Sequence, residues 1–182
     1  SAASDVYKRQ VQDAEAEFAK VVKSDMVVAE DGTLTPYEGA FVTSYEKDFK
    51  ENGRAHIFVC EIEGQTKYVI PVYGAGLWGA IWGYVALNED KNTVYGTYFS
   101  HASETPGLGA EISKPAFSNE FKGKKIFMSG EFKSVAVVKP GKSVAGQDYV
   151  DGISGGTITS KGVDEMLFNS LSGYVKFLTS QN

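Results

Sequence analysis

The sequence contains a single cysteine, Cys60, and two histidines, His56 and His101. One cysteine excludes a disulfide within the chain, and so few cysteines and histidines exclude a zinc site built from four ligands of these types. Positive charge is not in excess, because 18 basic residues face 23 acidic ones and the net charge is -5. A protein that binds the phosphate backbone of nucleic acid needs a basic face, so the composition argues against that class.

Glycine and aromatic residues are abundant by comparison. The chain of 182 residues is 42% hydrophobic and 13% aromatic, and it contains 20 glycines. This length and apolar content predict one folded domain over residues 1–182 with a core of its own. Tight glycine turns together with flat aromatic surfaces suit a planar ligand, and they suit a β-rich core equally well.

The longest uncharged stretch, Tyr68–Leu87, has the length of a membrane-spanning helix. It also contains Pro71 and four glycines, and its tyrosines and tryptophans are spread throughout rather than gathered at its ends. We therefore expect two buried strands, Lys67–Val72 and Ile81–Leu87, joined by a glycine-rich loop.

Helical patterns mark the two ends of the chain, and strand patterns fill its middle. Apolar residues recur at helical spacing in an amphipathic N-terminal segment, residues 1–23, and in a C-terminal segment, residues 160–180, which Thr159 or Ser160 can cap. Between them, from Val42 to Lys139, the expected strands are Ala55–Ile62, Thr66–Val72, Ile81–Leu87, Thr93–Ser100 and Lys133–Lys139. Helices at both ends of a mixed or antiparallel sheet predict the α+β class.

Two short motifs match enzyme signatures in the wrong context. Gly74–Gly79 fits the dinucleotide-binding pattern G-x-G-x-x-G, but the residues that follow favour a strand where that site needs a helix. Gly152–Gly156 fits the nucleophile elbow G-x-S-x-G around Ser154, yet both histidines lie upstream of that serine. Because another chain order can also build a triad, a serine hydrolase remains a rival hypothesis.

The segment from Asp151 to Ser160 precedes the C-terminal helix and contains three glycines and several hydroxyl groups. It could be a plain turn with a helix cap. It could also bind a phosphate, because small residues let the backbone approach closely and a helix start supplies free amides and the positive end of a dipole.

Within this segment, Asp151-x-x-Ser154-Gly155-Gly156-Thr157 resembles the flavinylation motif of the FMN-binding domain family. The resemblance implies that a flavin transferase recognises Asp151 and joins FMN to Thr157 through a phosphodiester. Gly156 departs from the alanine usual in the family, a change that removes one methyl group.

Two further blocks extend the resemblance. His101–Gly109 is similar to the Glu-Thr-Pro-Gly-Leu-Gly loop of the family. Gly76–Gly79 followed by Gly83–Leu87 is typical of the flavin-carrying subunits of sodium-translocating NADH:quinone oxidoreductases, and the related Rnf complex is the alternative. The resemblance implies an electron-transfer subunit on the periplasmic side of the bacterial inner membrane, with other membrane subunits as partners. Such subunits begin with a membrane helix, so we expect a domain without its anchor.

The resemblance also assigns roles to single residues. Phosphate contacts are expected from Ser154, Gly155, Gly156 and Thr159, ring contacts from Trp78 and Leu108, and contacts with the polar edge of the flavin from Glu104, Thr105 and Gly107. A cation at Lys139 would favour the reduced flavin, which carries more negative charge. No metal is expected, and no catalytic residue beyond the flavin. The plain alternatives are a core position for Trp78, an exposed strand end for Lys139, and a non-redox periplasmic module that binds another anion.

Overall fold

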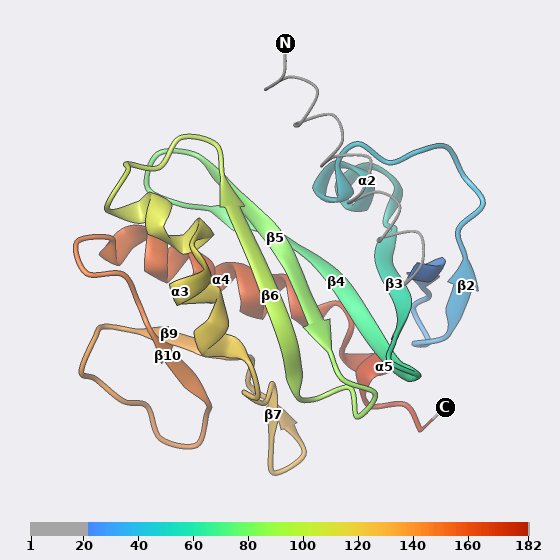
Figure 1. Ribbon diagram of the computed structural model, residues 1–182. Coiled ribbons are helices and arrows are strands. Elements are labelled where there is room, and N and C mark those ends of the chain that lie inside the picture. Colours follow the sequence, from blue (N-terminus) through green and yellow to red (C-terminus); the bar gives the residue numbers. More distant parts are fainter. Residues whose placement is uncertain (1–21, 182) are drawn as a thin grey trace.

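The computed structural model describes residues 22–181, and its main element is a six-stranded antiparallel sheet with strand order β2-β1-β3-β4-β5-β6 (Figure 1). The strands are β1 (Val22–Val28), β2 (Leu34–Pro36), β3 (Ala55–Ile62), β4 (Gln65–Ala75), β5 (Ala80–Leu87) and β6 (Val94–His101). The α+β prediction is therefore confirmed.

One face of this sheet carries the core. Alternate residues of β4 and β5 are buried there, among them Ile70, Val72 and Val85, as the two-residue period of a strand requires. The helices α4 (Thr157–Ser172) and α5 (Val175–Leu178) cover this inner face (Figure 1). A Cβ atom at Gly162 would lie 2.2 Å from the carbonyl oxygen of Ala75, so only glycine lets α4 pack this closely on the end of β4.

Shorter elements complete the fold. After β6 come η1 (Gly109–Ser113), α3 (Pro115–Ser118), η2 (Asn119–Phe121), the hairpin of β7 (Phe127–Met128) and β8 (Glu131–Phe132), and the parallel pair β9 (Ala136–Val138) and β10 (Tyr149–Asp151). Helix α2 (Tyr45–Asn52) lies on the outer face of the sheet, because its Tyr45 ring contacts Phe58 and Tyr84, which alternate with inward-facing residues.

Several predicted element boundaries differ from the structure. The helix predicted over residues 1–23 lies outside the described residues except for Val22 and Lys23, which begin β1. The helix predicted over residues 160–180 starts three residues earlier, at Thr157, and is divided into α4 and α5. Its N-cap is Gly156, so the expected caps Thr159 and Ser160 are wrong, and both are buried within the first turn.

The predicted strand Lys133–Lys139 shrinks to β9, because Ser134 has a φ of 64° and breaks the extended conformation. Helix α2 and the helical turns after β6 fall in a region that the sequence pattern assigned to strands.

The uncharged stretch Tyr68–Leu87 forms most of the β4–β5 hairpin, as predicted. Its turn is closed by a 2.8 Å hydrogen bond in which the backbone N–H of Gly76 donates to the carbonyl oxygen of Gly79. Within residues 22–181, no helix has both the length and the apolar composition needed to cross a bilayer.

A buried polar cluster joins β1, β3 and α2. The ring nitrogens of His56 lie 3.1 Å from an Asp25 oxygen and 2.7 Å from an Asp48 oxygen. Asp48 also accepts hydrogen bonds from Asn52 and Arg54. Burial by itself raises the pKa of the Asp48 carboxyl, but the hydrogen bonds from His56 and Asn52 and the charge of Arg54 outweigh it and hold the pKa below its usual range.

Ionised Asp48 should therefore stabilise the fold above the pKa of an unfolded aspartate, about 3.9, and this stability should be lost as the pH falls through the lower folded pKa. We expect Asp48→Asn to be less stable than the wild type near neutral pH and to lose less stability on acidification below about pH 4. Urea unfolding across this range measures it, with Glu51→Gln on the same helix as the control. Parallel acid dependence in the wild type and Asp48→Asn would contradict the assignment.

Candidate functional site

Three separate segments meet at the N-terminus of α4. Gly156 caps the helix with a φ of -119° and a ψ of 39°, and its carbonyl oxygen accepts the first helical hydrogen bond from the Ser160 N–H at 2.9 Å. The amides of Thr157, Ile158 and Thr159 occupy the first turn, where a helix offers no intrahelical acceptor. This end of α4 therefore has free donors and the positive end of the helix dipole, as an anion site requires.

The glycine loop before α4 is held in place by its backbone. The Gly152 N–H donates to the Val138 carbonyl oxygen at 2.7 Å, and the Ile153 N–H donates to the Ser160 hydroxyl at 2.8 Å. Gly155 has a φ of 76°, which favours glycine. These contacts fix the loop to β9 and α4 and leave the side chains of Ser154 and Thr157 exposed.

The loop from Glu104 to Gly109 lies directly on the glycine loop. A Cβ atom at Gly155 would come within 2.7 Å of a Leu108 methyl carbon, and one at Gly156 would lie 3.3 Å from the Gly109 nitrogen. The alanine usual in the family at position 156 would be a tight fit here, because its Cβ atom would lie 3.1 Å from the Ile153 Cβ atom, which is close but not a hard clash. The structure thus brings together the two blocks that the sequence singled out.

Glu104 joins these loops to the third block. Its carboxylate, 4% exposed, accepts a 2.9 Å hydrogen bond from the Trp78 N–H and a 2.6 Å hydrogen bond from the Thr159 hydroxyl. Burial raises the pKa of Glu104. The hydrogen bonds from the Thr159 hydroxyl and from the amides at Trp78, Gly79 and Leu77 lower it by more, so the net pKa is below the usual range. The carboxylate is ionised and fully engaged with the protein, and the Thr159 hydroxyl is likewise occupied.

An exposed apolar surface surrounds the start of α4. Trp78 is 63% exposed, so its interpretation as a core residue is wrong. Leu77, Leu108 and Ile158 are also exposed. Sequence analysis missed Leu77 and Ile158, since the first lies within a matched motif without a role of its own and the second follows Thr157 in what looked like a loop. Large apolar side chains gathered in solvent mark a binding surface.

A small pocket of about 110 Å³ places cations beside Thr157. Its lining includes Lys139 and Lys161 together with Thr157, Gly152 and Ser160. Lys139 was predicted, and it is both an exposed residue after β9 and a neighbour of Thr157. Lys161 was missed, although its place one turn after Thr157 on a helix was the available signal.

The remaining predicted residues lie close by. Asp151 ends β10 and is exposed, as are Thr105 and Gly107 in the Glu104–Gly109 loop. The histidines do not form a triad with Ser154: His56 contacts Asp25 and Asp48, and His101 accepts a hydrogen bond from the Glu104 N–H. Within the described chain, no hydrogen bond links Ser154 to either histidine, which removes the geometric basis of the serine hydrolase hypothesis.

Comparison with known proteins adds independent information. The model of the FMN-binding domain family matches residues 76–172, which include all three motif blocks. The solved structure of the C subunit of Na(+)-translocating NADH-quinone reductase from Parabacteroides distasonis ATCC 8503 is 66% identical, with a TM-score of 0.88 over 94% of this chain and 85% of that one.

Curated relatives agree with that structure. The C subunit of Na(+)-translocating NADH-quinone reductase from Chlamydia muridarum is 43% identical over an alignment of 126 residues, and the match covers 61% of this chain and 40% of the relative. Its counterpart from Vibrio vulnificus is 37% identical over 132 residues, covering 70% of this chain and 52% of the relative. The chain spans about half the length of these curated relatives. It therefore belongs to the FMN-binding domain family, and within that family to the C subunits of the Na(+)-translocating NADH-quinone reductase.

Proposed function

We propose that this chain carries FMN bound to Thr157 through a phosphodiester, and that it passes electrons within a sodium-translocating NADH:quinone reductase. The observation that carries the proposal is the position of Thr157. Its side chain is exposed in the first turn of α4 and lines a pocket with two lysines. A hydroxyl to be modified must be accessible, and the phosphate attached to it would need neutralisation.

The residues around Thr157 fit a phosphodiester. The first-turn amides of α4 and the amides of Ser154 and Gly155 would donate hydrogen bonds, since the amides of Gly152, Ile153 and Gly156 already have acceptors. Lys139 and Lys161 would supply positive charge. The Thr159 hydroxyl is not available to the phosphate, since it donates to Glu104. Thr159 would contribute its backbone amide, and Glu104 would hold the Trp78 loop and α4 in place.

The exposed apolar surface fits the flavin ring. Trp78 and Leu108, with Leu77 and Ile158, would contact the ring system. Thr105 and Gly107 are exposed in the same loop as Leu108 and would meet the polar edge of the flavin. When bound, the flavin supplies one-electron redox chemistry, and the residues of this chain position it. A covalent tether keeps the site occupied because no dissociation constant limits it.

Partners and location follow from the family and remain part of the proposal. The partners would be the other membrane subunits of the complex and, during maturation, a flavin transferase that recognises Asp151. The domain would lie at the periplasmic face of the bacterial inner membrane, tethered by an N-terminal anchor. The relatives favour the sodium-translocating reductase over the related Rnf complex.

Intact-mass measurement with and without the transferase tests the proposal. Protein produced alone should have the mass of its sequence. Protein produced together with the flavin transferase should gain one FMN less one water, keep its yellow colour after denaturation, and bleach reversibly when reduced with dithionite. A non-redox anion-binding module would show the same mass in both preparations, and that result would overturn the proposal.

A further inference from the structure

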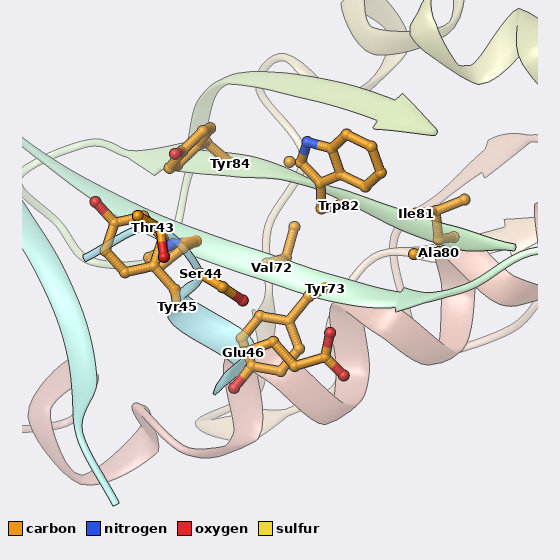
Figure 2. A pocket seen from close by; sticks show the side chains of 12 residues that line it. Thr43, Ser44, Tyr45, Glu46, Val72, Tyr73, Ala80, Ile81, Trp82 and Tyr84 are labelled. Atoms are coloured by element: carbon orange, nitrogen blue, oxygen red, sulfur yellow. The ribbon is translucent and has the colours of Figure 1, made fainter. Parts of the chain in front are cut away.

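The outer face of the sheet contains a pocket that the flavin proposal does not use. Its volume is about 330 Å³, and it lies between the start of α2 and the strands β4 and β5 (Figure 2). We call it the outer pocket. Its aromatic lining residues are Tyr45, Tyr73, Trp82 and Tyr84, and Thr43, Ser44 and Glu46 line it as well.

The sheet register explains why the aromatic rings gather here. Tyr73 of β4 pairs directly with Trp82 of β5, and Pro71 pairs with Tyr84, so all four side chains point to the same face. Tyr45 approaches from α2, with its ring centroid 6.5 Å from that of Tyr84 and an angle of 76° between the rings. Figure 2 shows the Tyr45 and Tyr73 rings, the Tyr84 ring and the Trp82 indole arranged around one space.

This pocket is distinct from the surface around Thr157. The aromatic strand residues alternate with Val72 and Ile81, which form part of the pocket lining and are buried in the core cluster together with residues of α4. Trp82 remains partly exposed despite its size. An exposed aromatic pocket without a structural partner in the described chain points to a ligand.

The charges around the outer pocket select the class of ligand. Glu46 lines it, and its carboxylate accepts a 2.5 Å hydrogen bond from the Lys50 ammonium, which lies outside the lining. Within residues 22–181, no lysine or arginine lines the pocket. The faces of the aromatic rings carry negative electrostatic potential, and so does the carboxylate. Glu46 and Asp48 in the first turn of α2 oppose the positive end of that helix dipole. An anion would therefore meet no positive side chain in the pocket lining itself, whereas a cation would meet several ring faces and a carboxylate that it shares with Lys50.

The tyrosine side chains of the outer pocket stay protonated and neutral over the physiological pH range. Burial, with the nearby Tyr84 and Asp25, raises the pKa of Tyr45 to about 12. Burial and the charge of Glu46 raise the pKa of Tyr73, and burial raises that of Tyr84. Neutral phenol rings supply cation–π attraction without titrating.

We propose that the outer pocket binds a quaternary ammonium group, held by the ring faces of Tyr45, Tyr73, Trp82 and Tyr84 and by the carboxylate of Glu46. A quaternary ammonium has no N–H to donate and binds through its charge, which suits a lining that contains four aromatic rings and a carboxylate. Such a group can come from a free small molecule or from a lipid headgroup, and the two share the same chemistry at the pocket.

Isothermal titration calorimetry with choline tests the proposal on the folded chain. The control ligand is 3,3-dimethylbutan-1-ol, which has the same shape and no charge. Choline should bind about tenfold more tightly than this isostere. Trp82→Leu should weaken choline binding about fivefold and Glu46→Gln about threefold, each with an unchanged circular dichroism spectrum. Tyr95→Leu, an exposed aromatic of β6 outside the pocket, should bind choline like the wild type.

A vesicle experiment separates the two sources of the ligand. If a lipid headgroup is the ligand, the chain should sediment with phosphatidylcholine vesicles and be released by free choline. If a free molecule is the ligand, choline should bind without such sedimentation. Equal affinity for choline and its neutral isostere, or no choline binding by the wild type, would overturn the proposal.

Discussion

Thr157→Ala should abolish covalent flavin attachment completely when the variant is produced with the flavin transferase, whereas the wild type should carry close to one FMN per chain. The reason is chemical, since alanine has no hydroxyl to form the phosphodiester. The side chain is exposed in the first helical turn, so the variant should keep the wild-type stability to within about 0.5 kcal/mol. Flavin absorbance of the denatured protein and its thermal unfolding midpoint measure the two effects.

Two matched variants make this result specific. Thr157→Ser keeps a hydroxyl at the same helical position and should retain some covalent flavin. Ser143→Ala removes an exposed hydroxyl outside the motif and should leave flavin attachment unchanged. Covalent flavin on folded Thr157→Ala would place the attachment elsewhere and refute the assignment.

Glu104→Ala should destabilise the protein by about 3 kcal/mol, because hydrogen bonds to a charged group contribute about 1.5–3 kcal/mol each and this carboxylate accepts at least two. The substitution leaves the buried Thr159 hydroxyl and the Trp78 amide without their acceptor. Urea unfolding gives the free-energy change directly.

The geometry of Glu104 also predicts a graded series. Glu104→Gln keeps an oxygen that can accept from the Trp78 amide, so its loss should be smaller than that of the alanine variant. Glu111→Ala, a half-buried carboxylate in η1, should change stability by no more than about 0.5 kcal/mol. A Glu104→Ala variant as stable as Glu111→Ala would contradict the role of Glu104 in joining the three segments.

Strands of the sheet were predictable where β-branched and aromatic residues are concentrated. The bounds of β3 match the predicted Ala55–Ile62, because the run Ile57-Phe58-Val59 at its centre has a strong preference for strands. Helix α2 was missed because its sequence, YEKDFKEN, is largely polar and has no broad apolar stripe. Its signals were local ones, the Ser44 cap, which accepts from the Lys47 N–H, and Gly53, which ends the helix with a φ of 67°.

The sequence predicted which residues belong to the site, but not which of them hydrogen-bond to one another. The motifs named Glu104, Thr157 and Thr159, and the structure places all three at the start of α4. That Glu104 and Thr159 bond to each other depends on β4, β6 and α4 converging from distant parts of the sequence, which no motif spacing encodes. The glycines before Thr157 obscured the helix start, so the sequence placed the helix from residue 160 and left Thr157 in a loop.

The attachment of the flavin to one particular hydroxyl is the central claim, and tandem mass spectrometry tests it most directly. Trypsin cleaves after Lys142 and Lys161, and the peptide between these sites contains Ser143, Ser154, Thr157, Thr159 and Ser160. Fragment ions that contain the N-terminus of the flavinylated peptide should carry the mass of FMN less water only when they extend to Thr157 or beyond. A modified fragment that ends at Ser154, or a modification confined to Thr159 or Ser160, would contradict the account.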